Sequence, residues 1–201
     1  MLKFALIGAG RIGRMHGSII AGHTKTELVW VYDILEDNAI NTANTTQARV
    51  AKSLDEIFED DSLDAVLIAS STETHAELIV RAAKTGKAVF CEKPIDLDIK
   101  RVDWCREQIQ GLQVPVQIGF NRRFDPSHRK VADTARDCGI GNLEQVIITS
   151  RDPNPPPKEY YLAAGGMFRD MTIHDFDMAR YVLNEEVETV MAMSATLFDP
   201  V

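Results

Sequence analysis

The stretch that decides the fold is Lys3-Phe4-Ala5-Leu6-Ile7-Gly8-Ala9-Gly10-Arg11-Ile12-Gly13, at the start of the chain. An apolar run that ends in glycines predicts a buried strand, and residues 11–21 have the spacing of a helix. Strand, glycine-rich turn and helix together indicate a dinucleotide site. Gly8 permits the tight turn, Gly10 lets a pyrophosphate approach the backbone, and Gly13 lets helix and strand pack closely.

An acidic residue follows at the distance that this motif requires. Asp33 ends the apolar run 28–32, a second predicted strand, and lies 20 residues after Gly13. Its carboxylate can accept hydrogen bonds from a ribose diol and would repel a 2′-phosphate. No arginine follows Asp33 directly, so NAD is the expected cofactor and NADP is disfavoured. The alternative is a turn that uses its glycines only for packing.

The pyrophosphate is expected at the start of the first helix. Free backbone N–H groups and the helix dipole favour an anion there. Arg11 and Ile12 open this helix and are therefore expected beside the cofactor, together with the three glycines.

Strands and helices alternate regularly as far as residue 118. Such alternation predicts an α/β fold, a doubly wound parallel sheet with helices on both faces. Six strands complete one nucleotide-binding domain of the Rossmann type, which we expect to span residues 1–118. The predicted strands are 3–7, 28–32, 48–51, 65–69, 88–90 and 114–118.

The pattern changes after Gly119. Helices are predicted at 126–136 and 172–183, and strands at 143–150 and 187–197. This order indicates an α+β second domain over residues 119–201, with an open, mostly antiparallel sheet. Two strands do not make a stable sheet with a covered face, so we expect this domain to be incomplete and the chain to be truncated at its C-terminus.

Composition narrows the functional class. The chain has 201 residues and a net charge of −8, which repels phosphate backbones and argues against a nucleic-acid partner. Its three cysteines are far apart and have no CxxC spacing, which favours a reducing compartment and no zinc site. No apolar run approaches the roughly 20 residues that span a bilayer. The first strand begins too early for a signal peptide, so we expect a cytoplasmic protein without a membrane partner.

The loop after the fourth predicted strand belongs to the expected cofactor crevice. Loops at the carboxyl ends of parallel strands form that crevice, which places Ser70, Thr72 and His75 near the cofactor. Thr72 is also the expected cap of the next helix. His75 faces the crevice in one interpretation and lies on the surface in the other.

The loop after the fifth strand carries a candidate catalytic lysine. In Glu92-Lys93-Pro94, the proline restricts Lys93 to extended geometry at the same crevice edge. Glu92 could pair with the ammonium or with a backbone group. The alternative is a surface turn with a solvated lysine.

A second cluster supplies a candidate base. Thr172 is expected to cap a helix, which puts His174 in its first turn, where the helix N-terminus disfavours the protonated ring. Asp170 precedes His174 by four residues, and a neutral imidazole held by a carboxylate can remove a hydroxyl proton. In one alternative, Asp170 is a local cap and His174 is a half-buried helix residue. In the other, His174 binds a metal with Asp170 or Asp177, but no third ligand is evident.

In combination, these motifs resemble the family of glucose–fructose oxidoreductases and inositol 2-dehydrogenases (Gfo/Idh/MocA). The resemblance covers the whole chain, and residues 150–160 are most similar to the inositol dehydrogenases. It rests on GAGRIG, Asp33, residues 92–94, Gly119-Phe120-Asn121-Arg122-Arg123-Phe124-Asp125, and Asp170 with His174.

The resemblance implies residue roles and an activity. Lys93 would contact the reacting hydroxyl and the nicotinamide ribose, His174 would be the general base, and Asp170 its partner and a substrate ligand. Arg123, Asp152 and Tyr160 are weaker candidates for binding polyol hydroxyls, and Arg123 could instead pair with Asp125. The implied reaction is NAD-dependent oxidation of myo-inositol to the 2-keto-inositol.

Family members continue beyond residue 201, and their second sheet usually carries the subunit interface. The complete protein is therefore expected to be a homo-oligomer, a dimer or a tetramer. Three alternatives remain. The first is a related dehydrogenase of sugars, sugar acids or amino sugars that uses NAD or NADP. The second is an inactive NAD-binding fragment. The third is a repressor with a Rossmann sensor, which the acidic balance and the lack of a helix-turn-helix segment disfavour.

Overall fold

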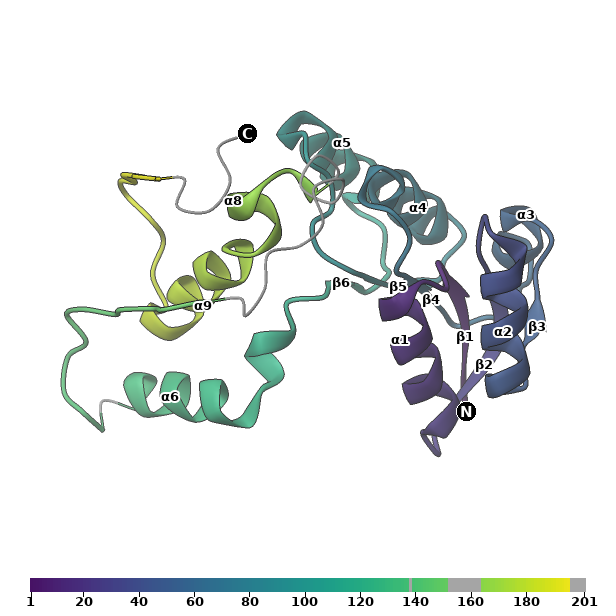
Figure 1. The fold of residues 1–201 in the computed structure, drawn as a ribbon, viewed down its shortest axis with the longest axis horizontal. Helices are drawn as coiled ribbons and strands as arrows, with labels where there is room; N and C mark the ends of the chain where they lie inside the picture. Colours follow the sequence, from purple (N-terminus) through teal and green to yellow (C-terminus); the bar gives the residue numbers. More distant parts are fainter. Residues whose placement is uncertain (138, 152–163, 196–201) are drawn as a thin grey trace. The chain divides into compact units, whose positions relative to one another are not determined.

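The computed structural model describes residues 1–137, 139–151 and 164–195 (Figure 1). In these residues, strands and helices alternate to Ile118, and only helices follow. The elements are β1 (Leu2–Ile7), α1 (Arg11–Gly22), β2 (Thr26–Tyr32), α2 (Glu36–Thr46), β3 (Arg49–Val50), α3 (Leu54–Phe58), β4 (Ala65–Ile68), α4 (Thr72–Lys84), β5 (Ala88–Cys91), α5 (Ile99–Ile109), β6 (Val116–Ile118), η1 (Asn121–Phe124), α6 (Pro126–Arg136), α8 (Met167–Asp170) and α9 (Ile173–Leu183).

The six strands form one parallel sheet in the order β3-β2-β1-β4-β5-β6. This is the doubly wound order, in which the chain reverses direction across the sheet between β1 and β4. The predicted Rossmann sheet is therefore confirmed. The carboxyl ends of β1, β4 and β5 lie side by side, which brings the loops beginning at Gly8, Ala69 and Glu92 to one edge.

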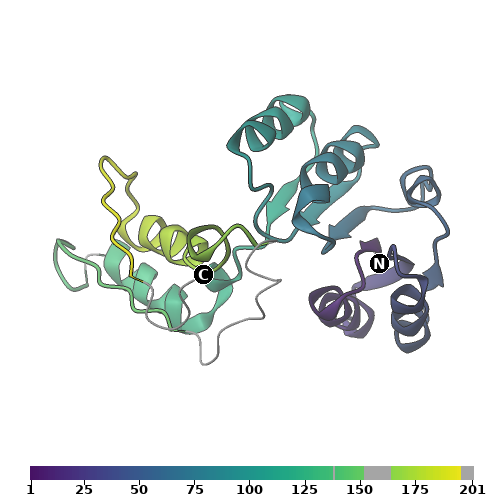
Figure 2. The ribbon, with the colours of Figure 1, turned by 45° about the horizontal axis from the view of Figure 1, so that its top comes forward.

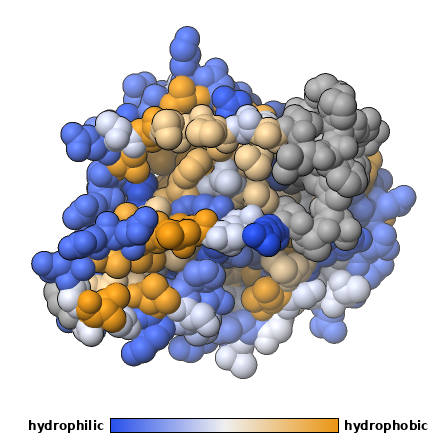
Figure 3. All heavy atoms as spheres, turned by 60° about the vertical axis from the view of Figure 1, so that its left-hand side comes forward, coloured by the Kyte–Doolittle hydropathy of each residue, from blue (hydrophilic) through white to orange (hydrophobic). Residues whose placement is uncertain are grey.

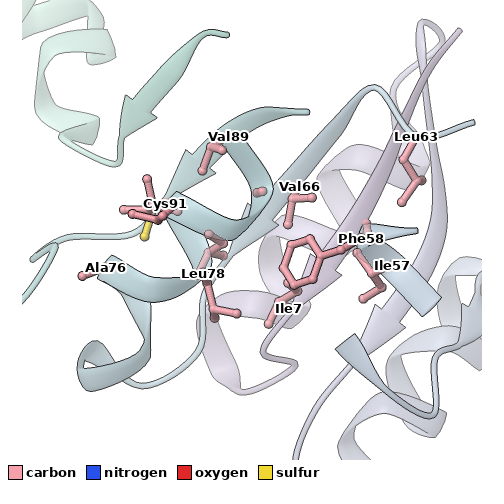
Figure 4. Close-up of a cluster of buried hydrophobic side chains, with 14 of the residues drawn as sticks. Ile7, Ile57, Phe58, Leu63, Val66, Ala76, Leu78, Val89 and Cys91 are labelled. Atoms are coloured by element: carbon pink, nitrogen blue, oxygen red, sulfur yellow. The ribbon is translucent and has the colours of Figure 1, made fainter. Parts of the chain in front are cut away.

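Helices cover both faces of this sheet (Figures 1 and 2). Alternate strand residues point to opposite faces, because the side-chain period of a strand is two. Ile7, Val66 and Ile68 pack with residues of α3, α4 and α5, and Figure 4 shows Ile7 and Val66 in this cluster beside Phe58. Leu6 and Leu67 pack on the other face, with residues of α1 and α2.

The chain forms two compact units. The first comprises residues 1–120 and 156–171, and the second comprises residues 121–155 and 172–201. In the second unit, α6 and α9 pack around Ala132, Met178 and Val182.

The prediction of two strands in the second unit is not confirmed. Neither 143–150 nor the described part of the second segment, 187–195, is paired in a sheet. A two-stranded ribbon is marginal without further strands or a covering layer, which is the physical reason. Hydrophobic side chains are consequently exposed here, including Ile147, Val190 and Met191. Figure 3 shows hydrophobic side chains among polar ones on one face of the molecule.

Asp60 links β2 to the loop after α3 and gives the first unit a pH-dependent contact. Trp30 Nε1 donates to its carboxylate at 2.8 Å and Ser62 N at 2.9 Å. Hydrogen bonding to the Ser62 side chain and then to Trp30 lowers the pKa of Asp60 from 3.8 to about 2, and the Ser62 N–H lowers it to a lesser extent. Because the folded-state pKa is depressed, the contribution to stability is present above about pH 4 and is lost towards about pH 2.

We expect Asp60→Asn to lower the free energy of unfolding at neutral pH and to flatten its decline between about pH 4 and pH 2. Urea unfolding at several pH values measures both effects. Asp61→Asn, next in the chain, is the control. An Asp60→Asn protein with the wild-type pH dependence would contradict the assignment.

Two cysteines of the described chain, Cys91 and Cys105, are buried and free. Burial raises the pKa of both thiols. Across residues 1–137, 139–151 and 164–195, no helix is long and apolar enough to cross a membrane.

Candidate dinucleotide site and catalytic cluster

The glycine-rich turn between β1 and α1 has little room for side chains. Gly8 has a φ of 91°, and a Cβ added to it would lie 2.4 Å from the backbone nitrogen of Ser70. A Cβ at Gly13 would lie 1.9 Å from the carbonyl oxygen of Gly8. At Gly10, in contrast, an added Cβ would meet nothing within 4 Å. The turn is therefore closed on the protein side and open on the outer side at Gly10.

This open side has the chemistry of an anion site. Gly10 is the N-cap residue of α1 and has no side chain to cap the helix. The first N–H groups of a helix have no intrahelical acceptor and attract phosphate oxygens. Arg11 is exposed and Ile12 half-buried at the start of this helix. The turn thus fits the pyrophosphate of a dinucleotide on the observed geometry.

Asp33 lies at the end of β2, against this turn. Its Oδ2 accepts a hydrogen bond from Ala9 N at 2.6 Å, and its Oδ1 accepts from Leu35 N at 2.8 Å. Oδ1 also accepts from Asn38 Nδ2 at 3.5 Å, whereas Oδ2 has a second lone pair that can accept from a ribose hydroxyl. Asp33 therefore holds the turn and presents a carboxylate to the adjacent pocket.

A hollow of about 420 Å³ opens beside these groups. Its wall includes Gly8, Gly10, Asp33 and Ser70, together with apolar side chains such as Leu78. The volume is within the range of small-ligand sites. The first unit thus contains a pocket that brings the glycine turn, the acidic residue and the loop after β4 together.

We expect Asp33→Asn to weaken NAD binding about tenfold and to narrow the preference for NAD over NADP. The change removes the charge that strengthens the ribose hydrogen bonds and repels a 2′-phosphate. Titration of the 201-residue chain with both dinucleotides measures the ratio of dissociation constants. Asp37→Asn, at an exposed position in the first turn of α2, is the control. An unchanged ratio would remove Asp33 from cofactor selection.

The loop after β4 differs from expectation in two details. Ser71, and not Thr72, is the N-cap residue of α4, which begins at Thr72. Ser70 Oγ and Thr74 Oγ1 are hydrogen-bonded at 2.7 Å. His75 is neither on the surface nor in the wall of the pocket, because only 2% of the residue is exposed.

Lys93 lies in the turn after β5, and its peptide bond to Pro94 is cis. Lys93 Nζ donates to Asp170 Oδ1 at 3.0 Å and to the Asp170 carbonyl oxygen at 2.7 Å. The Lys93 side chain is 16% exposed and that of Asp170 is 28% exposed. Both residues belong to the first unit, so the structure joins two of the three predicted catalytic residues and excludes a fully solvated lysine.

Glu92 has a side-chain partner that sequence reasoning did not identify. Its Oε1 lies 2.7 Å from His16 Nε2, on α1. Burial alone would raise the pKa of Glu92, but the hydrogen bond and the charge of His16 outweigh it, and the pKa is lowered. A Cβ at Gly119 would lie 3.0 Å from Glu92 Oε2. The carboxylate is therefore fixed between α1 and the end of β6.

The second unit holds the predicted base. Thr172 is the N-cap residue of α9, as expected, and His174 is half-buried in the first turn. The next residue, Asp175, accepts a hydrogen bond from Ser150 Oγ at 2.6 Å and pairs with Arg122. These contacts fix the helical turn that carries His174. Sequence reasoning missed them, because 53 positions separate Arg122 from Asp175.

Arg123 pairs with Asp177, and not with Asp125 as the alternative supposed. Arg123 Nε donates to Asp177 Oδ2 at 2.8 Å and Nη2 donates to Oδ1 at 2.6 Å. Hydrogen bonding to Asp177 raises the pKa of Arg123. Asp125 instead caps α6 by accepting from Ser127 N and His128 N. The two polyol-binding candidates Asp152 and Tyr160 lie outside the described residues.

Two family models match the chain. "Oxidoreductase family, NAD-binding Rossmann fold" matches residues 2–120, and "GFO/IDH/MocA C-terminal domain" matches residues 128–201. The first covers more than half of the chain. Its description as an NAD-binding Rossmann fold agrees with the structure, which has the glycine turn, Asp33 beside it and the parallel sheet.

Two inositol dehydrogenases are similar over nearly the whole chain. Inositol 2-dehydrogenase of Rhizobium meliloti is 46% identical over 98% of this chain and 60% of its own length. The structure of a myo-inositol dehydrogenase from Corynebacterium glutamicum is 48% identical, with a TM-score of 0.86 over 90% of this chain and 55% of that one.

A third similar protein was solved with ligands. Scyllo-inositol dehydrogenase from Lactobacillus casei, with NAD(H) and scyllo-inositol bound, is 30% identical, with a TM-score of 0.81. The alignment covers 92% of this chain and 57% of that one. The chain thus spans about 60% of the length of its curated relatives. Its matched domains and its Rossmann sheet place it in the Gfo/Idh/MocA family of oxidoreductases with an NAD-binding Rossmann fold.

Proposed function

We propose that the protein oxidises a ring secondary alcohol of a cyclic polyol, with myo-inositol as substrate and the 2-keto-inositol as product. The observation that carries the proposal is the contact of Lys93 with Asp170 in the unit that contains the dinucleotide pocket. The similarity to inositol dehydrogenases supports the choice of substrate. NAD, when bound, supplies the acceptor for the hydride that leaves the alcohol carbon.

Each of the candidate catalytic residues would then have a separate role in the reaction. Lys93 places an ammonium beside the reacting hydroxyl, where it stabilises the negative charge that develops on oxygen. Asp170 holds that ammonium through its carboxylate and its carbonyl oxygen. His174, in the first turn of α9, accepts the hydroxyl proton. Asp152 and Tyr160 stay proposed polyol ligands, whereas Arg123 is better supported as the residue that holds η1 to α9.

A related substrate is the first competitor. Scyllo-inositol, a sugar or a sugar acid presents the same secondary alcohol to the lysine. Because the polyol-binding candidates lie partly outside the described residues, the similarity to a scyllo-inositol dehydrogenase keeps this option open.

The second competitor is that the 201-residue chain binds NAD without turning a substrate over. Segments 143–150 and 187–195 carry no sheet pairing, and exposed apolar side chains lie along them, which favours this reading. In a longer protein we propose that these segments join an open antiparallel sheet and that the protein forms a homo-oligomer. Light scattering of that longer protein tests the assembly.

The deciding experiment follows NADH formation with myo-inositol, scyllo-inositol and glucose. It uses the 201-residue chain and a chimera that continues with the C-terminal residues of the Rhizobium meliloti relative. Activity in both proteins would place the working site within residues 1–201. Activity only in the chimera, with NAD binding in both, would make the shorter chain a cofactor-binding fragment. A chimera that binds NAD but oxidises none of the polyols would overturn the proposed function.

A further inference from the structure

His75 is a buried polar side chain that the proposed mechanism does not use. It lies in the first turns of α4 and is 2% exposed. Its Nδ1 is 2.7 Å from the carbonyl oxygen of Pro94, and its Nε2 is 3.0 Å from the carbonyl oxygen of Ser70. Burying an imidazole is costly unless its nitrogens are hydrogen-bonded. An apolar side chain would fill the same space without this requirement, so packing does not explain a histidine here.

The two carbonyl groups belong to different parts of the site. Ser70 lies in the wall of the dinucleotide pocket, and Pro94 directly follows Lys93. A single ring therefore joins the loop after β4 to the turn after β5. The contact to Pro94 is the shorter one and lies one residue from the lysine.

The opposite end of this turn is held from the other face of the sheet. His16 on α1 contacts Glu92, the residue before Lys93. Helix α1 packs with the cluster around Leu6, whereas α4 packs with the cluster around Ile7. The two helices therefore cover opposite faces of the sheet (Figure 1). The three-residue turn is thus fixed on both sides of Lys93, by histidines from two helices that cover opposite faces.

We propose that His75 is a positioning residue: its Nδ1–H donates to the Pro94 carbonyl oxygen and thereby sets the place of Lys93 relative to the cofactor pocket. The inference rests on the proposed function for its kinetic consequence. It assigns His75 to the turn that carries Lys93, in place of the contact with the cofactor that the sequence suggested.

Two conservative variants separate the two hydrogen bonds of the ring. The side-chain amide of His75→Asn replaces Nδ1 and can still donate to Pro94, whereas that of His75→Gln reaches the position of Nε2 and can donate to Ser70. His75→Ala removes both ring nitrogens and with them both contacts. Glu73→Gln, at an exposed position on the same helix, is the matched control.

In the active chimera, we expect His75→Gln and His75→Ala to lower kcat about 10- to 100-fold with little change in KM for NAD, because the lysine is displaced and the pocket remains. His75→Asn should restore most of the lost kcat. If His75→Gln does not fold, the kcat values of His75→Asn and His75→Ala are sufficient to test the role of the Nδ1 contact. An asparagine variant no more active than the alanine variant would overturn the proposal.

A second readout does not depend on turnover. The protein is treated with an amine-specific reagent, and mass spectrometry compares the labelling rate of Lys93 with that of the exposed Lys100. We expect faster Lys93 labelling in His75→Gln and the wild-type rate in His75→Asn. If this pattern appears in a protein that oxidises no polyol, the positioning role stands and the proposed function fails. Unchanged labelling and kcat in an active His75→Gln protein would show that His75 does not position Lys93.

Discussion

Lys93→Ala is expected to lower turnover of the polyol about 100- to 1,000-fold, while the affinity for NAD changes little. Lys93 Nζ is the ammonium that would stabilise the developing alkoxide, and the loss of one such group has an effect of this size. The pocket beside Gly8, Gly10 and Asp33 does not include Lys93, which is why cofactor binding should persist. Steady-state kinetics of the chimera and NAD titration measure the two quantities separately.

Two variants make this result specific. Lys93→Arg keeps the positive charge but has a planar, longer head group that does not reproduce the two contacts with Asp170, so we expect it to recover little activity. Lys100→Ala, at an exposed position in α5, should behave as the wild type. Normal turnover in Lys93→Ala would remove this residue from the mechanism.

Gly13→Ala is expected to destabilise the first unit by about 3 kcal/mol or more and to abolish NAD binding. The added Cβ would lie 1.9 Å from the carbonyl oxygen of Gly8 and 2.8 Å from its carbonyl carbon. Both are backbone atoms, so helix α1 would have to move away from the turn. Overpacking of a closely packed site typically costs about 1–3 kcal/mol, and a contact this short belongs at the upper end. Urea unfolding of the 201-residue chain measures the loss.

Gly10→Ala is the matched comparison, because its Cβ would meet no atom within 4 Å. We expect this variant to unfold at nearly the wild-type urea concentration but to bind NAD weakly, since the methyl group would occupy the side from which the pyrophosphate approaches. Equal loss of stability in both variants would mean that the turn is merely intolerant of side chains. Full NAD affinity in Gly10→Ala would move the pyrophosphate away from this turn.

The sequence predicted the parallel sheet within residues 1–118 well, because its signals are local. The apolar runs and the glycines at Gly8, Gly10 and Gly13 report on strand, turn and helix within a few residues of one another. The same locality explains why Thr172 was placed correctly at the N-cap position of α9, whereas the N-cap position of α4 was misplaced by one residue at Thr72. The side chain of Ser71 makes no capping hydrogen bond, so hydroxyl chemistry does not distinguish it from the adjacent Thr72.

Prediction was weakest where residues distant in the sequence meet. His75 could be assigned to a crevice or to the surface from its motif, yet the packing of α4 on the sheet turns it inward to Pro94. Nothing in the sequence around His16 indicated its contact with Glu92, since the two residues are 76 positions apart. The strands expected at 143–150 and over the described residues 187–195 are not paired in a sheet, for a related reason. An alternating pattern permits a strand, but neighbouring strands and a covering layer are needed to stabilise it.

By itself, the sequence determined the parallel sheet, the dinucleotide turn with Asp33, and the residue types of the proposed chemistry. Only the tertiary structure decided that Lys93 contacts Asp170, that Arg123 pairs with Asp177, and that His75 holds the turn after β5. The physical reason is the range of the interactions. Hydrophobic period and glycine conformation act between near neighbours, whereas a buried polar contact depends on which faces of two packed elements meet.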